Sequence, residues 1–337
     1  MFKRFFLVFF CAVFITGVGP ASAGAETLKL QVVYPETSHV GKVVKFFKAD
    51  LEKLSSGGMQ VEIIWPGSEQ FIPTAEAFEG LVQGRIGLYV TSLLYHEKEV
   101  PEGSCQWLPF NWETPEEAKE ILLNKGFVKT LSAAVEKKGA LYLAPLSVAT
   151  MGLMTTFPIN KLEDIKGKNL RAVGFEAKIV SALGGVPVPT SPNDQLEKMK
   201  AGQILGTDYP WYTMEVYKFY EVLKHISAPG LHTPGVIDFL AGKKAVEALP
   251  EAQQKAIRQA AHDAMEYSFT AAREIDQKVL ADAKKRNVEM TILSFEEQAR
   301  FREALKPLWE EEAKKSPEAS ELVSILLSVL ISKGYQW

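Results

Sequence analysis

Residues 28–65 read LKLQVVYPETSHVGKVVKFFKADLEKLSSGGMQVEIIW, and this stretch decides the fold class. Residues 28–34 alternate as a strand does and end at Pro35. From 40 to 54 the apolar residues recur at helical spacing, and residues 61–65 form a second strand-like run. A strand, a helix and a strand joined this tightly predict a parallel βαβ unit.

The alternation of strands and helices continues along the chain. A helix over 74–83 and a strand over 86–90 complete a β-α-β-α-β block. The next predicted helices lie at 115–137, 176–183 and 193–201. The next predicted strands lie at 140–144, 151–155, 170–173, 186–188, 204–209, 222–226 and 236–240. We predict an α/β fold with a second sheet that holds residues 162–209, after which the chain crosses back to the first lobe.

Two apolar patterns follow in the C-terminal part. Residues 250–286 keep an apolar stripe without a helix breaker. At 1.5 Å per residue this helix is roughly 55 Å long, so we expect it to brace both lobes. The run 322–331 is interrupted by Ser324 and Ser328 and is too short to span a bilayer, which favours a packing helix.

The N-terminus has the pattern of an export signal. Lys3 and Arg4 precede an apolar run over 5–18, and residues 21–23 supply a small-residue cleavage site. We therefore predict that 1–23 is a signal peptide and that the mature protein is periplasmic. An uncleaved N-terminal anchor remains the alternative.

Charge and cysteine content exclude several classes of protein. Without Lys3 and Arg4, 36 basic residues stand against 41 acidic ones, a net charge of about −5, which argues against a nucleic-acid partner. Cys11 lies in the predicted signal peptide, so Cys105 has no intramolecular partner and no disulfide framework supports the fold. The burial of Cys105 stays open.

A search for catalytic motifs favours binding over catalysis. There is no nucleophile elbow, and His96-Glu97 lacks the second histidine of the zinc motif H-E-x-x-H. Residues 235–244 do not have the spacing of a phosphate loop, and histidine and cysteine form no cluster with metal-ligand spacing. We predict no enzymatic activity, no cofactor and no metal.

One basic residue stands out in an apolar strand. Arg171 lies within residues 168–174 and can present its planar fork to a carboxylate. The alternative is an arginine paired with Asp194 or Asp208. Residues 207–212 form a second candidate, because their aromatic rings can wall a binding site or simply pack in a lobe.

Seven segments in order carry a family resemblance. They include Leu108-Pro109-Phe110, the run from Leu162 to Arg171, and Leu183-Gly184-Gly185-Val186-Pro187-Val188-Pro189. The remaining segments lie at 54–62, 79–86, 155–159 and 199–210. Together they resemble the DctP-type solute receptors of tripartite ATP-independent periplasmic (TRAP) transporters, over essentially the whole mature chain.

The resemblance implies a fold, a site and partners. It implies a two-lobed periplasmic binding protein fold, type II-like, with β-strand hinge crossings, a long helix across both lobes and hinge closure on the ligand. It also implies that Arg171 clamps the ligand carboxylate. The partners would be one small and one large membrane subunit, driven by an ion gradient. We expect lobe I to hold 24–148 with about 238–277, and lobe II to hold 149–237 with about 278–337.

The departures from the family pattern limit the ligand. Met151 stands where sugar-acid receptors often carry a second arginine. The family motif Asp-Gly-x-Glu-Asn-Pro becomes Leu205-Gly206-Thr207-Asp208-Tyr209-Pro210, with Trp211 next. Apolar and aromatic residues here remove polar partners that a sugar acid or dicarboxylate would need. We predict a monocarboxylate with an apolar or aromatic body, such as an oxo, hydroxy or amino acid.

Further ligand-wall candidates follow from the resemblance by position. They are Tyr34, Glu36, Ser92, Trp107 and Phe110, each of which can equally be core or surface. Glu36 is included because an acid in the site can pair with a ligand amine.

Two rival functions remain. One is a binding protein that serves a membrane sensor kinase. The other is a secreted enzyme in which Asp208 or Glu36 acts as a base on a carboxylate held by Arg171.

Overall fold

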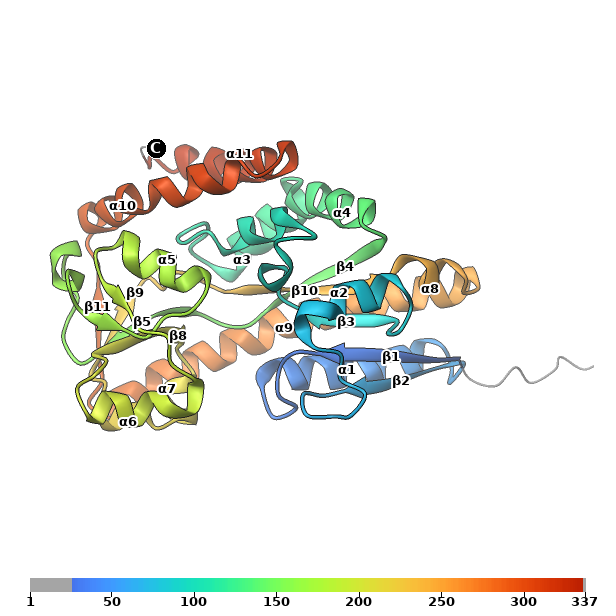
Figure 1. The fold of residues 1–337 in the computed structure, drawn as a ribbon, viewed down its shortest axis with the longest axis horizontal. Coiled ribbons are helices and arrows are strands. Elements are labelled where there is room, and N and C mark those ends of the chain that lie inside the picture. The colour runs from blue at the N-terminus through green and yellow to red at the C-terminus, as the bar shows by residue number, and fades with distance from the viewer. Residues whose placement is uncertain (1–25, 336–337) are drawn as a thin grey trace, which may run out of the picture.

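The computed structural model describes residues 26–335 and contains two main β-sheets with helices around them (Figure 1). The predicted signal peptide, residues 1–23, lies outside the described residues. Within 26–335, no helix combines the length and the apolar content that a membrane span requires. Cys105 is buried, which answers the question that the sequence leaves open.

The first sheet has the strand order β2-β1-β3-β10-β4. Strand β1 (Glu26–Val32) pairs in parallel with β2 (Met59–Ile64) and with β3 (Leu88–Thr91). Strand β10 (Val236–Gly242) lies antiparallel between β3 and β4 (Ala140–Ser147). The predicted β-α-β-α-β block and the return of the chain to the first sheet are both confirmed.

The helices of the block begin and end close to where the sequence predicts. Helix α1 (His39–Leu54) begins after Ser38, whose hydroxyl accepts a hydrogen bond from the Gly41 N–H at 3.1 Å. This cap satisfies one free amide of the first turn. Helix α2 (Thr74–Val82) follows β2, and α8 (Lys243–Glu247) follows β10.

The single helix predicted over 115–137 is wrong. The structure has α3 (Pro115–Lys119), a π-helical turn (Glu120–Asn124) and α4 (Phe127–Lys137). Gly126 separates them with a φ of 94°. A glycine adopts this left-handed conformation without the steric cost that a Cβ atom imposes, and it therefore ends the first helical segment.

The second sheet has the order β11-β9-β5-β8. Its strands are β5 (Met151–Thr155), β8 (Gly206–Pro210), β9 (His225–Ala228) and β11 (Glu289–Ile292). The other two strands of the predicted second block, β6 (Asn169–Leu170) and β7 (Val186–Pro187), form a separate two-stranded sheet. The prediction of one sheet for 162–209 is wrong because β6 is only two residues long and pairs along β7.

The other helices surround the second sheet or cross the molecule. Helices α5 (Phe175–Ala182), α6 (Gln195–Lys200) and α7 (Thr213–Val216) follow short strands. Helix α10 (Phe295–Ala313) and strand β11 are not predicted from the sequence. Short 3₁₀ turns occupy Leu93–His96, Pro101–Trp107, Leu162–Ile165, Pro192–Asp194 and Phe219–Glu221.

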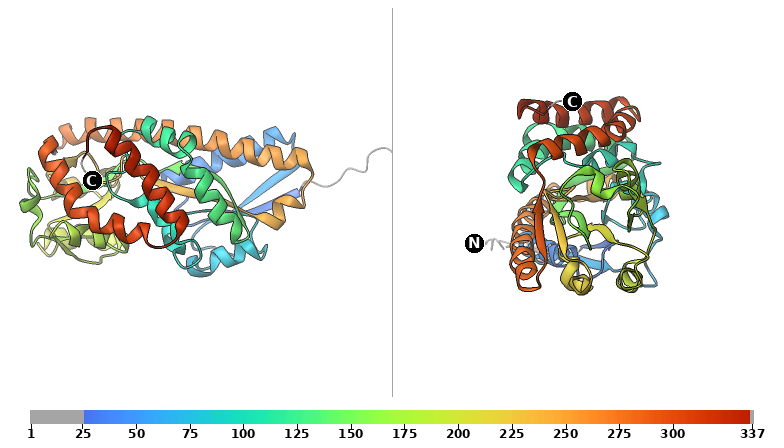
Figure 2. Two further views of the ribbon diagram at one scale, coloured as in Figure 1. Left: turned by 90° about the horizontal axis from the view of Figure 1, so that it is seen from above. Right: turned by 90° about the vertical axis from the view of Figure 1, so that its left-hand side faces the viewer.

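The long helix α9 (Glu251–Lys285) runs along the length of the molecule (Figure 2). Its first half, including Ile257 and Phe269, packs in the core of the first sheet. Its last turns, including Val279 and Ala283, pack in a second core with strands of the second sheet. The prediction that this helix braces both halves of the molecule is confirmed.

The C-terminal helix α11 (Pro317–Ser332) packs on α10, on α4 and on the 3₁₀ turn Pro101–Trp107. Helix α4 and this turn belong with the first sheet, although the predicted lobe boundary assigns 278–337 to the second lobe. The predicted lobe boundaries otherwise stay a prediction. This packing argues for placing α11 with the first lobe.

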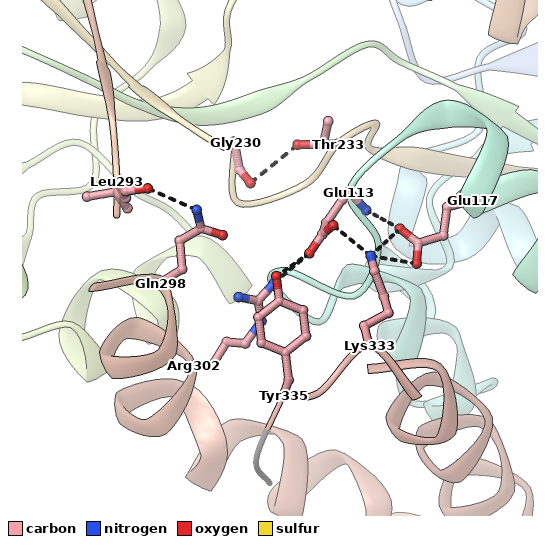
Figure 3. Close-up of polar contacts among 9 residues, drawn as sticks. All are labelled: Glu113, Glu117, Gly230, Thr233, Leu293, Gln298, Arg302, Lys333 and Tyr335. Carbon is pink, nitrogen blue, oxygen red and sulfur yellow. Dashed lines mark hydrogen bonds and ion pairs between the residues drawn. The ribbon is translucent and has the colours of Figure 1, made fainter. Parts of the chain in front are cut away.

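A polar cluster fastens the end of the described chain, and we call it the C-terminal clasp: Glu113, Glu117, Arg302, Lys333 and Tyr335 (Figure 3). Lys333 Nζ lies 2.6 Å from Glu113 Oε2 and 2.9 Å from Glu117 Oε1. The Tyr335 hydroxyl donates to Glu113 Oε1 at 2.6 Å, and its ring centroid lies 3.8 Å from Arg302 Cζ. The clasp ties α11 to α3 and α10.

The clasp predicts unequal effects of two substitutions of Tyr335. Tyr335→Phe removes one hydrogen bond and is expected to lower the free energy of unfolding by about 1 kcal/mol. Tyr335→Ala also removes the ring stacked on Phe295 and Arg302, with an expected loss of about 2–4 kcal/mol. Urea unfolding followed by circular dichroism measures both. Equal losses for the two variants would contradict the proposed contribution of the ring.

Candidate functional site

Arg171 stands directly after β6, where the chain meets β8. Its backbone N–H donates to Gly206 O at 2.8 Å, and its carbonyl accepts from the Asp208 N–H at 3.0 Å. These bonds make a parallel bridge between Arg171 and Thr207. Bridged residues in parallel strands point to the same face, so the Arg171 side chain lies on the face of Thr207 and Tyr209.

The Arg171 side chain is buried without an acidic partner. Only 5% of the residue is exposed, and Nε donates to Thr190 O at 3.1 Å. Its Cζ atom lies 4.6 Å from the centroid of the Tyr209 ring, a cation–π contact. None of the ion pairs formed within 4.0 Å by residues 26–335 includes Arg171. The alternative of a pair with Asp194 or Asp208 is therefore wrong.

The other fully buried arginine of the described chain is different. Arg302 is 3% exposed, and its Nη2 lies 3.4 Å from Glu113 Oε1. Arg302 thus has a carboxylate within the clasp, whereas the Arg171 guanidinium has a carbonyl and an aromatic ring. This contrast makes Arg171 the candidate anion-binding group.

The charge of Arg171 affects the pKa of two side chains that the sequence analysis does not include as site residues, Tyr95 and Glu176. Burial raises the pKa of Tyr95, the Glu176 carboxylate raises it further, and the Arg171 guanidinium opposes both effects. Burial also raises the pKa of Glu176, against the lowering effect of Arg171. Tyr95 lies in the 3₁₀ turn that follows β3, and Glu176 lies in the first turn of α5.

We name this group the Arg171 cluster: Arg171, Thr190, Tyr209, Tyr95 and Glu176. Tyr95 comes from the first half of the molecule and the other four from the second. Only the fold brings them together. The sequence carries one weak signal for Glu176, since this acid begins a predicted helix five residues after Arg171.

Tyr34, a predicted wall residue, lies on the Tyr95 side of the cluster. Burial raises its pKa well above the usual value, and Tyr95, Asp238 and Tyr212 add to this rise. Tyr34 is half-buried after β1, and Tyr212 is half-buried after β8. Of the tyrosines, Tyr209 has a contact with the Arg171 guanidinium, at 4.6 Å from Cζ to the ring centroid.

Asp208 and Trp211 are more deeply buried than residues that line a binding site need to be. Asp208 is fully buried and neither carboxylate oxygen has a hydrogen-bond partner in the described structure. Burial raises its pKa well above the usual range, Glu176 raises it further and Arg171 lowers it. Trp211 is 5% exposed with an unpartnered Nε1. Both residues lie within two positions of Tyr209 in the sequence. The Trp211 side chain packs mainly in the second hydrophobic core.

Met151 and Trp107 lie around a buried histidine. Met151 bridges His232 through the backbone, and the Trp107 ring packs edge-on against the His232 ring at 5.3 Å between centroids. Burial lowers the pKa of His232 to about 3. All three residues are buried. Next to Met151, a Cβ atom on Gly152 would lie 3.0 Å from Gly230 Cα, so this contact requires glycine.

The remaining predicted wall residues have other partners. Glu36 is exposed and pairs with Lys45 at 2.7 Å. The Ser92 hydroxyl accepts from the Leu94 N–H at 3.3 Å as the cap of a 3₁₀ turn. Phe110 is 2% exposed, at 5.1 Å from Arg302 Cζ. Their roles in binding stay predictions, and the packing of Phe110 favours a core residue.

Other potential sites lie away from the Arg171 cluster. Among residues 26–335, no group of three or more His, Cys, Asp or Glu side chains has the arrangement of a metal site. Two surface hollows of about 530 and 540 Å³ lie beside the start of α9 and beside α3. Neither includes a residue of the cluster.

Comparison with known proteins decides the family. The model of the DctP family, described as bacterial extracellular solute-binding protein, family 7, matches residues 31–316. This chain belongs to the DctP family. The resemblance seen in the sequence is confirmed, and so is the expected two-lobed α/β class of fold, which structures of TRAP periplasmic solute-binding proteins share.

Two similar proteins differ in what their names give as bound. The C4-dicarboxylate-binding periplasmic protein DctP of Rhodobacter capsulatus is 26% identical over 304 residues, which cover 88% of this chain and 89% of the relative. A TRAP periplasmic solute-binding protein of Ochrobactrum anthropi, with its C-terminus bound in the ligand-binding pocket, has a TM-score of 0.80 and 24% identity, and covers 93% of this chain and 99% of its own.

A third relative holds a sugar acid. The TRAP periplasmic solute-binding protein of a Sulfitobacter species, solved with bound β-D-galacturonate, has a TM-score of 0.73 and 20% identity. The match covers 89% of this chain and 99% of that one. At these identities the solved structures show only the fold that this chain shares with TRAP periplasmic solute-binding proteins, so its ligand has to be inferred from its own residues.

Proposed function

We propose that this protein is the periplasmic receptor of a TRAP transporter and binds a small organic monocarboxylate through Arg171. The supporting observation is the buried guanidinium of Arg171, which has no carboxylate within 4.0 Å among residues 26–335. An uncompensated buried charge is costly. A ligand carboxylate that accepts two parallel hydrogen bonds from the fork would remove this cost and fix the orientation of the ligand.

The surroundings of Arg171 support an apolar or aromatic ligand body. Tyr209 covers the guanidinium, and Met151 is a buried apolar residue of the neighbouring strand β5. The polyhydroxylated ring of a sugar acid would lose hydrogen bonds to water against such side chains without replacing them. Because Arg171 is only 5% exposed, we propose that a ligand enters when the two lobes part and is held when they close.

Membership of the DctP family supports the proposal that the ligand is delivered to two membrane subunits. In this proposal the protein binds and releases its ligand unchanged. Recovery of intact ligand after prolonged incubation would support a receptor, whereas turnover would support the secreted enzyme. Capture of a sensor kinase in place of the transporter subunits would support the sensory role.

A thermal-shift screen of the purified protein tests the proposal. The library contains monocarboxylates with branched or aromatic bodies, C4-dicarboxylates, sugar acids and amino acids. At 100 times the dissociation constant, a ligand stabilises the folded state by about 2.7 kcal/mol, which corresponds to a rise of about 5 °C in melting temperature. We expect rises with monocarboxylates of apolar or aromatic body. Rises only with dicarboxylates or sugar acids would overturn the proposed ligand class.

A further inference from the structure

The side chains of Arg171, Tyr209 and Trp211 lie on one face of strand β8. Arg171 bridges Thr207, and alternate residues of a strand share a face, which places Arg171 with Thr207 and Tyr209. The ladder of β5 and β8 continues one residue beyond β8, because the Trp211 N–H donates to Thr150 O at 3.0 Å. Trp211, two residues after Tyr209, therefore extends the same alternation.

The indole N–H of Trp211 lies on this face beside Tyr209. Tyr209 is the partner of Gly152 in the antiparallel pair of β8 and β5, and paired residues project to the same face. A Cβ atom on Gly152 would lie 3.3 Å from Trp211 Nε1. The Arg171 guanidinium, on the other side of β8, lies 4.6 Å from the centroid of the Tyr209 ring. Tyr209 is thus flanked by the guanidinium and by the indole N–H.

Trp211 Nε1 is a buried donor without a hydrogen-bond partner among residues 26–335. Another buried tryptophan, Trp112, differs, because its Nε1 donates to Pro234 O at 2.8 Å. A buried donor left unpaired costs free energy, so an acceptor at Trp211 Nε1 would stabilise the protein. An indole nitrogen donates and cannot accept, which restricts the partner to an acceptor.

We infer that the ligand is a monocarboxylate with one further, uncharged oxygen atom, a carbonyl or a hydroxyl, which accepts a hydrogen bond from Trp211 Nε1. This inference rests on the proposed function, in which Arg171 holds the carboxylate. The indole N–H adds selection for the second oxygen. The ligand reaches this N–H, as it reaches Arg171, when the two lobes part.

The chemistry of the indole N–H sets the selectivity. An ammonium group has no lone pair and cannot accept from Trp211 Nε1, so oxo and hydroxy acids are favoured over amino acids. A second carboxylate can accept, but one neutral donor does not compensate for burying its charge. The inference therefore narrows the proposed ligand class to oxo and hydroxy monocarboxylates.

Matched acids that differ only in one substituent test the inference. Isothermal titration at pH 7.5 compares 4-methylpentanoate, 4-methyl-2-oxopentanoate and L-leucine, and likewise 3-phenylpropanoate, phenylpyruvate, 3-phenyllactate and L-phenylalanine. Pentanoate and 4-oxopentanoate place the added oxygen further from the carboxylate. In at least one series we expect an oxo or hydroxy acid to bind roughly 5- to 20-fold more tightly than the acid without this oxygen, and more tightly than any amino acid of that series.

Trp211→Phe removes the N–H and keeps an aromatic ring. We expect it to weaken the favoured oxo or hydroxy acid by roughly 5- to 20-fold and the acid without the added oxygen by less than about 2-fold. Trp112→Phe is the matched control. It breaks the bond to Pro234 O, so it is expected to lower the urea midpoint of unfolding and to leave the ratio of the two affinities unchanged. The series measured on the natural protein decides by itself if Trp211→Phe does not fold.

The outcomes distinguish the inference from the function on which it rests. Oxo and hydroxy acids that bind no more tightly than the acids without the added oxygen, or less tightly than the amino acids, overturn the inference and leave the carboxylate receptor intact. Absence of binding by every oxo and hydroxy acid tested also overturns it, as does a preference for the added oxygen that survives Trp211→Phe. If no carboxylate in the wider library shows binding that depends on Arg171, the receptor proposal itself fails.

Discussion

Arg171→Ala is expected to weaken the binding of L-leucine or 4-methyl-2-oxopentanoate, whichever binds more tightly, by roughly 100- to 1000-fold, because two charge-assisted hydrogen bonds contribute about 3–4 kcal/mol. Arg171→Lys keeps a positive charge and loses the planar fork, so we expect a smaller loss of roughly 10-fold. Isothermal titration of the purified variants measures both losses.

Two controls separate binding from folding in this experiment. Arg171 Nε donates to Thr190 O, so its removal also costs about 1–2 kcal/mol of stability, which urea unfolding without ligand measures. Arg286→Ala is the matched control, since Arg286 also lies over a tyrosine, Tyr220, at 4.2 Å from Cζ to the ring centroid, and is exposed. Arg286→Ala is expected to leave affinity unchanged. If Arg171→Ala binds the ligand with unchanged affinity, Arg171 does not clamp the ligand carboxylate.

Asp238→Asn is expected to remove a pH dependence of stability that arises in the centre of the first sheet. Asp238 is fully buried on β10 and accepts hydrogen bonds from the Leu93 N–H at 2.6 Å and from Gln106 Nε2 at 2.9 Å. Burial nevertheless raises its pKa to about 7. The titratable side chains Tyr34 and Tyr142 lie close to it.

The sign of the effect follows from the raised pKa. The folded state holds the Asp238 proton more tightly than the unfolded state, whose carboxyl has a pKa of about 3.9. Its stabilising contribution is therefore complete below about pH 4 and is lost as the pH rises towards 7. Relative to Asp238→Asn, the natural protein is expected to lose about 2–3 kcal/mol of unfolding free energy between pH 5 and pH 8.

The surroundings of Asp238 make the variant a fair test. Gln106 Oε1 is buried without a hydrogen-bond partner. After a flip of the Gln106 amide, this oxygen can accept from the new carboxamide at position 238, whose oxygen still accepts from Leu93. Urea unfolding at pH 5, 6, 7 and 8 compares the two proteins. If the unfolding free energies of the two proteins change in parallel between pH 5 and pH 8, Asp238 does not titrate in this range.

Much of the fold follows from local sequence patterns. The alternation over 28–34, the helical period over 40–54 and the unbroken stripe over 250–286 each correspond to an observed element, because periodicity reports which face of an element is buried. The helix predicted over 115–137 is interrupted at Gly126, and the helix at 295–313 is not predicted. The first break has a local cause, since Gly126 adopts a left-handed backbone conformation that favours glycine.

The sequence by itself determined most strands and helices up to residue 286, the family and the presence of one unusual arginine, since these depend on residue type and spacing along the chain. Only the tertiary structure decided that Arg171 has no ion-pair partner among residues 26–335, that Glu36 forms an ion pair with Lys45, and that the Tyr209 ring lies against the guanidinium. Charge pairing depends on distances between atoms remote in sequence, and those distances are fixed by packing the two sheets against the helix that spans both.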